Sequence, residues 1–430
     1  MKHRGTMPGQ HAEPRRVGLF GPYVSRNLGD TATQMAVIQN LQRRCKAIDI
    51  LGISPEPDNT LQSLGIPAFP LSGLGPTAGN LMPYVDLPSA AQSEAWRRPY
   101  SPIVIRRIAR FVRTLDLLII SGGGQLDDFW GGAWNHPWSM LIWTALARRY
   151  RIPVIYLAVG VDGLKENLSR RFSIMALRIA QRRLFRDSRS YEVMRAMGLE
   201  QPCEVCPDLV FALDSGWKGG GTPADSRFVV ISPISHKTWS RNETDLHTGY
   251  LSALANIGRD LLGRGYAVRI VCSQSAMDMG DAVALATELR QGGASNVEVR
   301  DAPRVDDFIT AVHGADLVIA SRLHGVILSL VTGCPVVALA HLDKVRAVMD
   351  DFELGEYCQP LQEVQGDAVL PLVRRALENS RDLRLHVQRV ATEFRMRLDK
   401  VFDEVAQLAD GSGWHMAPHD TALDAKRSGG

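Results

Sequence analysis

Short apolar runs that alternate with helix-like segments constrain the fold of this chain more than any other feature. The run VGLFGPY at 17–23 is followed by a segment in which Met35, Ile38 and Leu41 recur at helical spacing, and then by KAIDILGI at 46–53. A buried strand, an amphipathic helix and a second buried strand are the repeating unit of a parallel sheet covered by helices. The sequence therefore predicts an α/β fold that begins with a doubly wound sheet.

This alternation occurs twice along the chain. The strand-like runs stand at 17–23, 46–53, 115–120, 153–160 and 182–188, and then at 228–234, 266–274, 315–320 and 335–340. Between the two series lies a segment rich in glycine, serine and proline, which is typical of a linker. We therefore predict two facing Rossmann-like domains with a central cleft: a disordered tail at 1–16, an N-terminal domain at 17–214, a linker at 215–227, a C-terminal domain at 228–408, and a disordered tail at 409–430.

The composition excludes several classes of protein. Basic and acidic side chains nearly balance, 49 against 46, and no long Lys/Arg run is present, so we expect no nucleic-acid partner. The longest apolar stretch, at 326–340, is interrupted by Thr332, Gly333 and Pro335, so no transmembrane segment is predicted. The start of the chain lacks the apolar region of a secretory signal. These features predict a cytoplasmic protein and leave peripheral contact with the inner face of a membrane open.

The six cysteines give no sign of a metal site or a disulfide framework. Cys203 and Cys206 form one C-x-x-C pair, but no second pair and no histidine pair at zinc-finger spacing accompany it. In a chain of 430 residues without a secretory signal, cysteines are usually reduced. We expect structural cysteines and no bound metal.

Two glycine-containing turns follow predicted strands of the first domain. NLGD at 27–30 precedes a helix that Asp30 or Thr31 is predicted to cap, and SGGGQ at 121–125 follows the run at 115–120. Glycine lets the backbone approach a ligand closely, and free N–H groups in such turns attract anions. The candidate binding residues of these turns are Asn27, Gly29, Asp30, Gly122, Gly123, Gly124 and Gln125.

Two further turns carry cationic side chains. FRDSR at 185–189 ends a strand in the first domain, and SRLHG at 321–325 joins a strand ending at Ala320 to a helix beginning near His324. Lys344 follows the next strand, and adjacent strand ends of a parallel sheet converge on one edge. Cations around one small ligand indicate a multiply charged anion, and a histidine with a pKa of ~6.5 transfers protons near neutrality.

The chain lacks a G-x-S-x-G elbow, a dominant carboxylate pair and a clear metal cluster. These absences favour group transfer from a phosphate-bearing donor that is positioned and stabilised by cationic side chains.

The four turns together with the segment PDLV at 207–210 and the segment from 321 to 344 resemble the polysaccharide pyruvyl transferase family. The resemblance extends over about residues 17 to 352 and is most specific in its C-terminal part. It implies a GT-B-like fold and transfer of pyruvate from phosphoenolpyruvate, the co-substrate, onto two hydroxyls of a sugar as a cyclic ketal. No other cofactor is implied. The residues carried over are the catalytic candidates Arg186, His324 and Lys344, and the substrate-binding candidates Arg322, Leu323 and Gly325.

The resemblance leaves the acceptor open: a lipid-linked unit, a nucleotide sugar and a polymer are all compatible. We assign the N-terminal domain to the acceptor, with an irregular excursion from 54 to about 102 as a candidate lid. The chain departs from the family at His341, where an aromatic residue or asparagine is usual, so the role of His341 is undecided. Other candidates for sugar contact, each with a packing role as the alternative, are Trp130, Trp134, Trp138, Asp127, Asp128 and His136.

Two other functions remain compatible with the same residues. A GT-B glycosyltransferase with a nucleotide-sugar donor would need a carboxylate for the ribose, for which only Asp343, Asp350 and Asp351 are weak candidates. A non-catalytic protein that binds sugar or phosphate would keep the fold without turnover. The sequence does not predict the oligomeric state.

Overall fold

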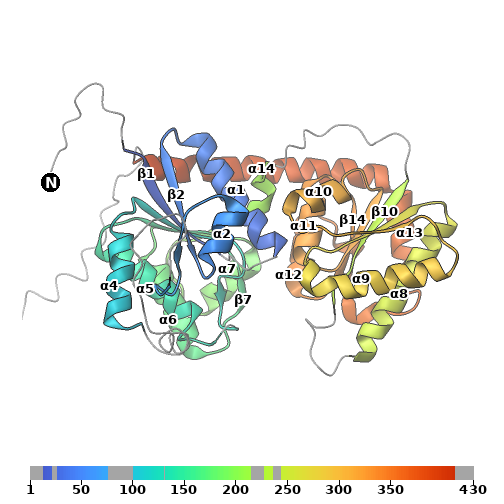
Figure 1. Ribbon diagram of the computed structural model, residues 1–430, viewed down its shortest axis with the longest axis horizontal. Helices are drawn as coiled ribbons and strands as arrows, with labels where there is room; N and C mark the ends of the chain where they lie inside the picture. The colour runs from blue at the N-terminus through green and yellow to red at the C-terminus, as the bar shows by residue number, and fades with distance from the viewer. Residues whose placement is uncertain are drawn as a thin grey trace, which may run out of the picture.

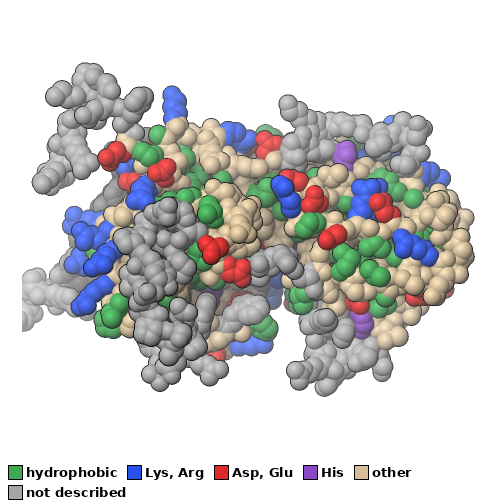
Figure 2. Space-filling view, in the orientation of Figure 1, with side chains coloured by type: hydrophobic (Ala, Val, Ile, Leu, Met, Phe, Trp, Pro, Cys, Tyr) green, Lys and Arg blue, Asp and Glu red, His purple; other side chains and the backbone are tan. Residues whose placement is uncertain are grey.

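The computed structural model describes residues 13–21, 27–75, 100–129, 131–214, 227–235 and 244–411. The predicted linker, apart from its last residue, and most of both predicted tails lie outside these ranges. The described chain forms two lobes, each built on a parallel β-sheet with helices packed against it (Figures 1 and 2). This confirms the predicted α/β class with two Rossmann-like sheets.

The N-terminal sheet has the strand order β3-β2-β1-β4-β6-β8-β9, and its neighbouring strands are all parallel. Its strands are β1 (Arg15–Phe20), β2 (Ile48–Ser54), β3 (Ala68–Pro70), β4 (Leu117–Ser121), β6 (Val154–Val159), β8 (Arg182–Phe185) and β9 (Glu204–Val205). A separate two-stranded pair joins β5 (Leu126–Asp127) and β7 (Val161–Gly163). The helices are α1 (Leu28–Arg44), α2 (Pro57–Leu64), α4 (Pro102–Val112), α5 (His136–Arg149), α6 (Asn167–Ile179), α7 (Ser188–Ala196) and the 3-10 helix η1 (Leu209–Ala212).

The C-terminal sheet repeats this plan in the order β12-β11-β10-β13-β14-β15. Its strands are β10 (Phe228–Ser232), β11 (Ala267–Val271), β12 (Val297–Arg300), β13 (Leu317–Ala320), β14 (Val336–Ala340) and β15 (Cys358–Pro360). Its helices are α8 (Thr244–Gly263), α9 (Ser275–Gln291), α10 (Val305–Val312), α11 (Leu323–Val331), α12 (Asp343–Asp351) and α13 (Leu370–Glu378). In each sheet the strand order reverses beside the first strand, and open α/β sheets bind ligands at the carboxyl ends of strands at such a point.

The long helix α14 (Ser380–Asp410) runs along both lobes (Figure 1). Near its start, Arg384 donates to the carbonyl of Ala315 in the C-terminal lobe. Further along, Asp399 and Asp403 pair with Arg44 of α1 at 2.6 and 2.7 Å. One continuous cluster of buried apolar side chains also includes residues from both lobes. The two lobes are therefore joined by packed core as well as by the chain between them.

Several predicted boundaries are wrong by a few residues. Strand β1 begins at Arg15, inside the predicted tail, because Asp116 accepts hydrogen bonds from the side chain of Arg15 and the backbone of Arg16. Helix α14 continues to Asp410, so the predicted C-terminal tail begins too early, and Gly411 ends the helix with a φ of 73°. The chain from 54 to 75 is also not irregular, because it contains α2 and β3. The remaining candidate lid, at 76–99, lies outside the described residues.

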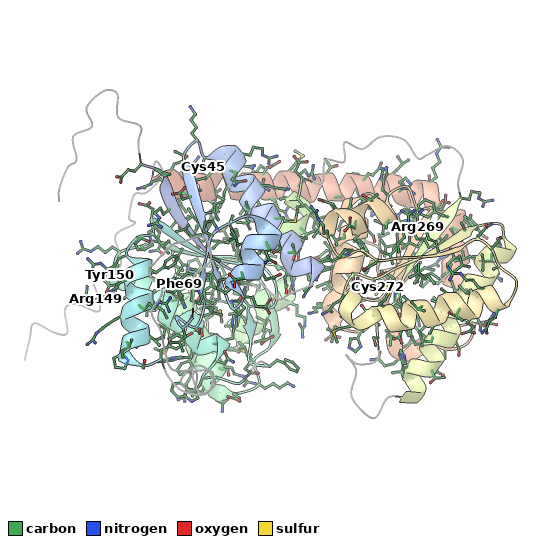
Figure 3. The ribbon with its side chains drawn as sticks, viewed as in Figure 1. Cys45, Phe69, Arg149, Tyr150, Arg269 and Cys272 are labelled. Atoms are coloured by element: carbon green, nitrogen blue, oxygen red, sulfur yellow. The ribbon has the colours of Figure 1, made fainter. Side chains whose placement is uncertain are left out.

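All six cysteines are free, in agreement with the expectation of structural thiols. Cys45 and Cys272 lie in different lobes (Figure 3), and burial raises the pKa of both thiols, to about 11 and about 12. In the part of the chain that the structure describes, no helix is both long and apolar enough to cross a membrane. Within the same residues, no group of three or more His, Cys, Asp and Glu side chains is arranged to hold a metal ion.

Candidate active site

The SRLHG turn lies at the reversal point of the C-terminal sheet. Strand β13 ends at Ala320 as the sequence predicted, and α11 begins at Leu323, one residue before the predicted start, with Arg322 as its extended N-cap residue. Strand β13 lies next to β10, the first strand of this sheet. Leu323 and Gly325 are buried, so they shape the turn from within, whereas Arg322 and His324 are half-buried. The two polar side chains thus stand where a ligand of this fold is expected.

Arg322 makes a two-pronged ion pair with Asp278 of α9. Its Nε lies 2.5 Å from Asp278 Oδ2 and its Nη2 lies 2.7 Å from Asp278 Oδ1. Asp278 has no exposed surface and also accepts the backbone N–H of Ser235 at 2.9 Å. Two of the guanidinium nitrogens of Arg322 therefore face Asp278, which fixes the orientation of the side chain. If Arg322 binds a substrate anion, as the resemblance implies, the anion cannot use this same edge of the guanidinium.

His324 meets the NLGD turn of the other lobe. A Cβ atom added to Gly29 would lie 1.9 Å from both Cγ and Nδ1 of His324. Asn27 is the N-cap of α1, and it orders the turn by accepting from Gly29 N at 3.1 Å and donating to Asp30 Oδ2 at 2.8 Å. The imidazole of one lobe is thus seated against the glycine of the other. The helix begins at Leu28, three residues earlier than a cap at Asp30 implies and four earlier than a cap at Thr31 implies, because the Asn27 side chain caps its first turn.

The contact between Gly29 and His324 brings together the N-terminal ends of α1 and α11. Each end carries the partial positive charge of a helix dipole, because its first backbone N–H groups have no partner within the helix. Helix ends of this kind attract phosphate and carboxylate groups. Two facing helix N-termini with a histidine between them therefore favour an anion at this point of the interface.

The SGGGQ turn is a tightly packed structural element. Gly122 and Gly123 have φ values of 57° and 60°, and a Cβ on Gly122 would lie 2.1 Å from a methyl group of Thr33. The amide of Gln125 is used internally, by the carbonyl of Ser121 at 3.1 Å and by His136 Nε2 at 2.8 Å. Through these contacts Gln125 stabilises the turn. The predicted contacts of Gln125 and Gly124 with substrate stay predictions.

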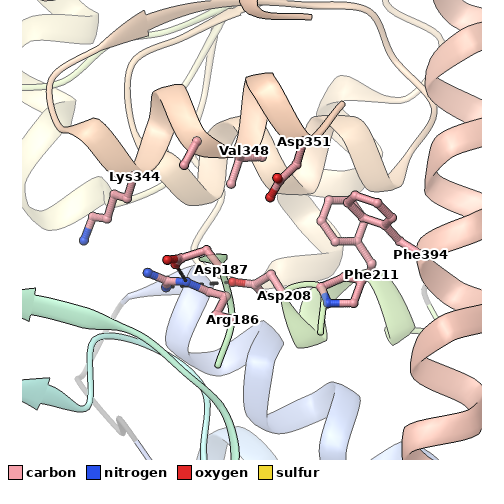
Figure 4. Close-up of a pocket in the computed structure, with 10 residues that line it drawn as sticks. Arg186, Asp187, Asp208, Phe211, Lys344, Val348, Asp351 and Phe394 are labelled. Atoms are coloured by element: carbon pink, nitrogen blue, oxygen red, sulfur yellow. Dashed lines mark hydrogen bonds and ion pairs between the residues drawn. The ribbon is translucent and has the colours of Figure 1, made fainter. Parts of the chain in front are cut away.

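Arg186 and Lys344 line one pocket between the lobes (Figure 4). Arg186 follows β8, and only 6% of it is exposed. Lys344 extends from the first turn of α12 in the opposite lobe. The lining consists of Arg186, Asp187, Pro207, Asp208, Phe211, Lys344, Ala347, Val348, Asp351 and Phe394.

Three carboxylates accompany the two cations of this pocket and outnumber them. Asp187 and Asp208 lie 3.4 and 3.9 Å from the guanidinium of Arg186, and each also accepts a backbone N–H at the start of a helix. Burial raises the pKa of Asp351 to about 6, and the negative charge of Asp187 adds to this. The pocket therefore becomes less negative as the pH falls through about 6. Arg186 and Lys344 thus line the same pocket, but it contains more acidic side chains than the sequence suggested.

The aromatic candidates for sugar contact are mainly packed against one another. Trp134 and Trp138 lie 5.2 Å apart, and both rings contact Phe172. Burial lowers the pKa of His136 to about 4, so this imidazole is neutral at pH 7. Asp128 Oδ2 accepts from the backbone N–H groups of Lys165 and Glu166, each at 2.8 Å.

The placement of these groups favours the packing alternative for Trp138 and Asp128, while 42% of Trp134 remains exposed. Asp127 accepts from the backbone N–H of Phe129 at 3.1 Å, and His341 follows β14 just before α12. Trp130 lies outside the described residues.

Two residues of the site were missed by sequence reasoning. Asp278 is 44 residues from Arg322 and sits within a helix whose sequence pattern gives no sign of a buried charge. Gly160 ends the segment at 153–160, and a Cβ there would lie 2.6 Å from Arg186 Nη2. The position of Gly160 directly after a predicted buried strand could have indicated its role. No feature of the sequence indicates that Asp278 pairs with Arg322.

The arrangement of the two lobes is that of the GT-B fold. A UDP-GlcNAc 2-epimerase from Neisseria meningitidis bound to UDP-GlcNAc superposes with a TM-score of 0.59 at 12% identity, over 91% of this chain and 98% of that one. A glycosyltransferase from Rickettsia africae gives 0.53 at 9% identity, over 92% and 98%. A UDP-GlcNAc 2-epimerase from Methanocaldococcus jannaschii gives 0.54 at 10% identity, over 84% and 92%. At such identities the similarity establishes the fold alone.

The family follows from the sequence match. Residues 27–343 match the polysaccharide pyruvyl transferase family, which is more than half of the chain, so the protein belongs to this family of transferases. The matched range includes the NLGD, SGGGQ, FRDSR and SRLHG turns, and Lys344 is the next residue after it. Among curated proteins, none matches the chain in sequence.

Proposed function

We propose that this protein transfers pyruvate from phosphoenolpyruvate onto two hydroxyls of a saccharide, which forms a cyclic ketal and releases phosphate. The observation that carries the proposal is the seating of His324, from the SRLHG turn of one lobe, against Gly29 of the other lobe. The imidazole of His324 thus lies between two helix N-termini, and such a setting supports binding of an anionic donor beside a group that can transfer protons. Family membership supports the same reaction class.

The reaction adds two sugar oxygens to the central carbon of phosphoenolpyruvate. Protonation of the terminal carbon produces the methyl group, the first hydroxyl adds with loss of its proton, and the C–O bond to phosphate then breaks. The second hydroxyl adds to the same carbon and loses its proton, so one proton goes to carbon and one remains with the released phosphate. We assign these transfers to His324, which protonates as imidazolium and deprotonates a hydroxyl as imidazole.

The cationic side chains hold the donor in this proposal. Arg186 and Lys344 approach the interface from opposite lobes, so both reach a ligand bound between them. We assign Arg322 to orientation of the turn and to one end of the donor, because Asp278 already holds two of its nitrogens. The N-terminal lobe takes the acceptor, which is a lipid-linked, nucleotide-linked or polymeric sugar.

The test incubates the purified protein with phosphoenolpyruvate and a panel of lipid-linked and synthetic glycosides, and records phosphate release and product mass together. We expect phosphate release matched by a pyruvate ketal on one sugar, and loss of both signals in His324→Ala. If a nucleotide sugar binds and phosphoenolpyruvate does not, the protein is a glycosyltransferase and the proposed role of Lys344 is wrong. Binding of phosphoenolpyruvate without turnover on any glycoside would favour a non-catalytic binding protein.

A further inference from the structure

Helix α4, which sequence reasoning missed, has one apolar and one basic face. Val104, Ile108 and Phe111 are buried against the N-terminal lobe. The outer face carries Ile103, Arg106, Arg110 and Arg113, which recur at helical spacing and are all exposed. Ile103 is 59% exposed, although it stands on a helix with a well-formed buried side. The exposed stripe is thus basic along its length and apolar at its start.

The end of helix α5 extends this stripe into a patch. Arg149 and Arg151 are exposed there, and the guanidiniums of Arg113 and Arg149 lie 5.6 and 6.0 Å from the ring centre of Tyr150. Figure 2 shows blue side chains gathered at this end of the molecule, and Figure 3 places Arg149 and Tyr150 beside α4. We call this surface the arginine patch; it consists of Arg106, Arg110, Arg113, Arg149 and Arg151.

The arginine patch lacks the carboxylates that pair with several arginines on other surfaces of the described residues. Between the described residues, none of its five members has a salt bridge, whereas Arg44, Arg182, Arg259 and Arg374 on other surfaces are all paired. The segment from 100 to 126 has one acidic residue, Asp116, which pairs with Arg15, and the segment from 131 to 161 has none. Since the whole chain has a net charge of only +3, the patch is a local concentration of positive charge.

We propose that the arginine patch binds the surface of an anionic lipid bilayer. The patch lies on outward-facing helices rather than in a groove, and it combines guanidiniums with the exposed side chain of Ile103, which suits the interface of headgroups and acyl chains. Phosphate headgroups complement its charge. This surface belongs to the lobe that we assign to the acceptor, so a docked protein would reach saccharides carried on lipids. The proposal stands on the patch itself and does not depend on the reaction.

The test measures sedimentation of the full-length protein with phosphatidylcholine vesicles, with and without phosphatidylglycerol. Each arginine near an anionic surface contributes roughly fivefold in affinity, so the triple variant Arg106→Gln/Arg110→Gln/Arg113→Gln should bind anionic vesicles on the order of 100-fold more weakly. The matched control is Arg259→Gln/Arg304→Gln/Arg381→Gln, which removes the same charge from exposed positions of the C-terminal lobe and should bind like the unaltered protein. Ile103→Ser should weaken binding without a change of charge.

Salt provides a second measurement that needs no variant. Binding to anionic vesicles should fall steeply between about 0.1 M and about 1 M salt, because the screening length shrinks from ~10 Å to ~3 Å. The proposal is overturned if the protein does not bind anionic vesicles, or if it binds neutral vesicles as well as anionic ones. It is also overturned if both triple variants lose the same share of their binding to anionic vesicles. Binding to an anionic polysaccharide or to nucleic acid, in the absence of vesicle binding, would assign the patch to that partner instead.

Discussion

Replacing Gly29 with alanine should disable the site without harming the fold. The new Cβ would stand 1.9 Å from the ring of His324, whereas carbon atoms in contact are separated by about 3.5 Å. The ring must therefore retreat by roughly 1.5 Å, or the lobes must separate, and a displacement of ~1 Å at a reacting group costs ~100-fold in rate. We expect kcat for phosphate release to fall on the order of 100-fold.

Loss of stability cannot account for that result. Gly29 lies in the first turn of α1 without a positive φ, and alanine is favoured over glycine in helices by about 1 kcal/mol. The matched control is Gly280→Ala in α9, where a Cβ meets nothing within 4 Å, and this variant should keep the wild-type rate. Because alanine is the better helix former, neither variant should unfold at a lower temperature than the unaltered protein.

A double-mutant cycle identifies the route of the effect. If Gly29→Ala acts by moving His324, it should add nothing to the loss already caused by His324→Ala. A Gly29→Ala variant that keeps the wild-type kcat would refute the reasoning, since it would mean that the contact between the lobes is not part of the working site. Losses that multiply in the double variant would show that Gly29 acts on something other than His324.

Three further predictions concern single groups. His324→Ala should lower kcat by ~100- to 10,000-fold with unchanged thermal stability, and a variant that keeps more than a tenth of the rate would contradict the acid–base role. Asp278→Asn breaks a buried ion pair and should lower the free energy of unfolding by about 3 kcal/mol in denaturant titrations. The control Glu393→Gln breaks an exposed pair and should lower it by less than about 1 kcal/mol. Equal losses in the two variants would contradict the structural role of Asp278. The pKa of His136 is about 4 when folded and 6.5 when unfolded, so the unfolded chain takes up the proton first and stability falls as the pH drops through this range. Between pH 7 and pH 5 this loss is about 2 kcal/mol, and it should be absent from His136→Gln.

The alternation of apolar runs was enough to predict both sheets, because buried parallel strands are short and almost wholly apolar. Strand β13 ends at Ala320 as the pattern indicated, and helix α11 begins at Leu323, one residue before the predicted start. Helix α4 was missed because its residues follow a proline-rich stretch, and because Arg107, which reads as a surface residue, is buried with its guanidinium on the carbonyls of Gly73 and Gly75. A local pattern does not indicate that an arginine is satisfied by backbone so far away in the sequence.

The site was predicted as a set of residues but not as an arrangement. Strand ends could be recognised one by one, so Arg186, Arg322, His324 and Lys344 were found. The structure divides them into three groups: Arg322 is paired with Asp278, His324 packs against Gly29, and Arg186 and Lys344 line one pocket. Two of the three groups combine residues of both lobes. They depend on how the lobes are oriented, which the spacing of residues within one segment does not encode.

That orientation is set largely at a distance from the site. Helix α14 is tied to α1 through Asp399 and Asp403, and Arg395 of the same helix donates to the carbonyl of Leu213 at 2.8 Å. Since α1 carries Gly29 at its other end, these bonds hold the NLGD turn in register with the C-terminal lobe that presents His324. The distance between Gly29 and His324 therefore depends on the α1–α14 interface and on the shared apolar core. Substitutions in that interface or core should alter the site by moving the imidazole of His324.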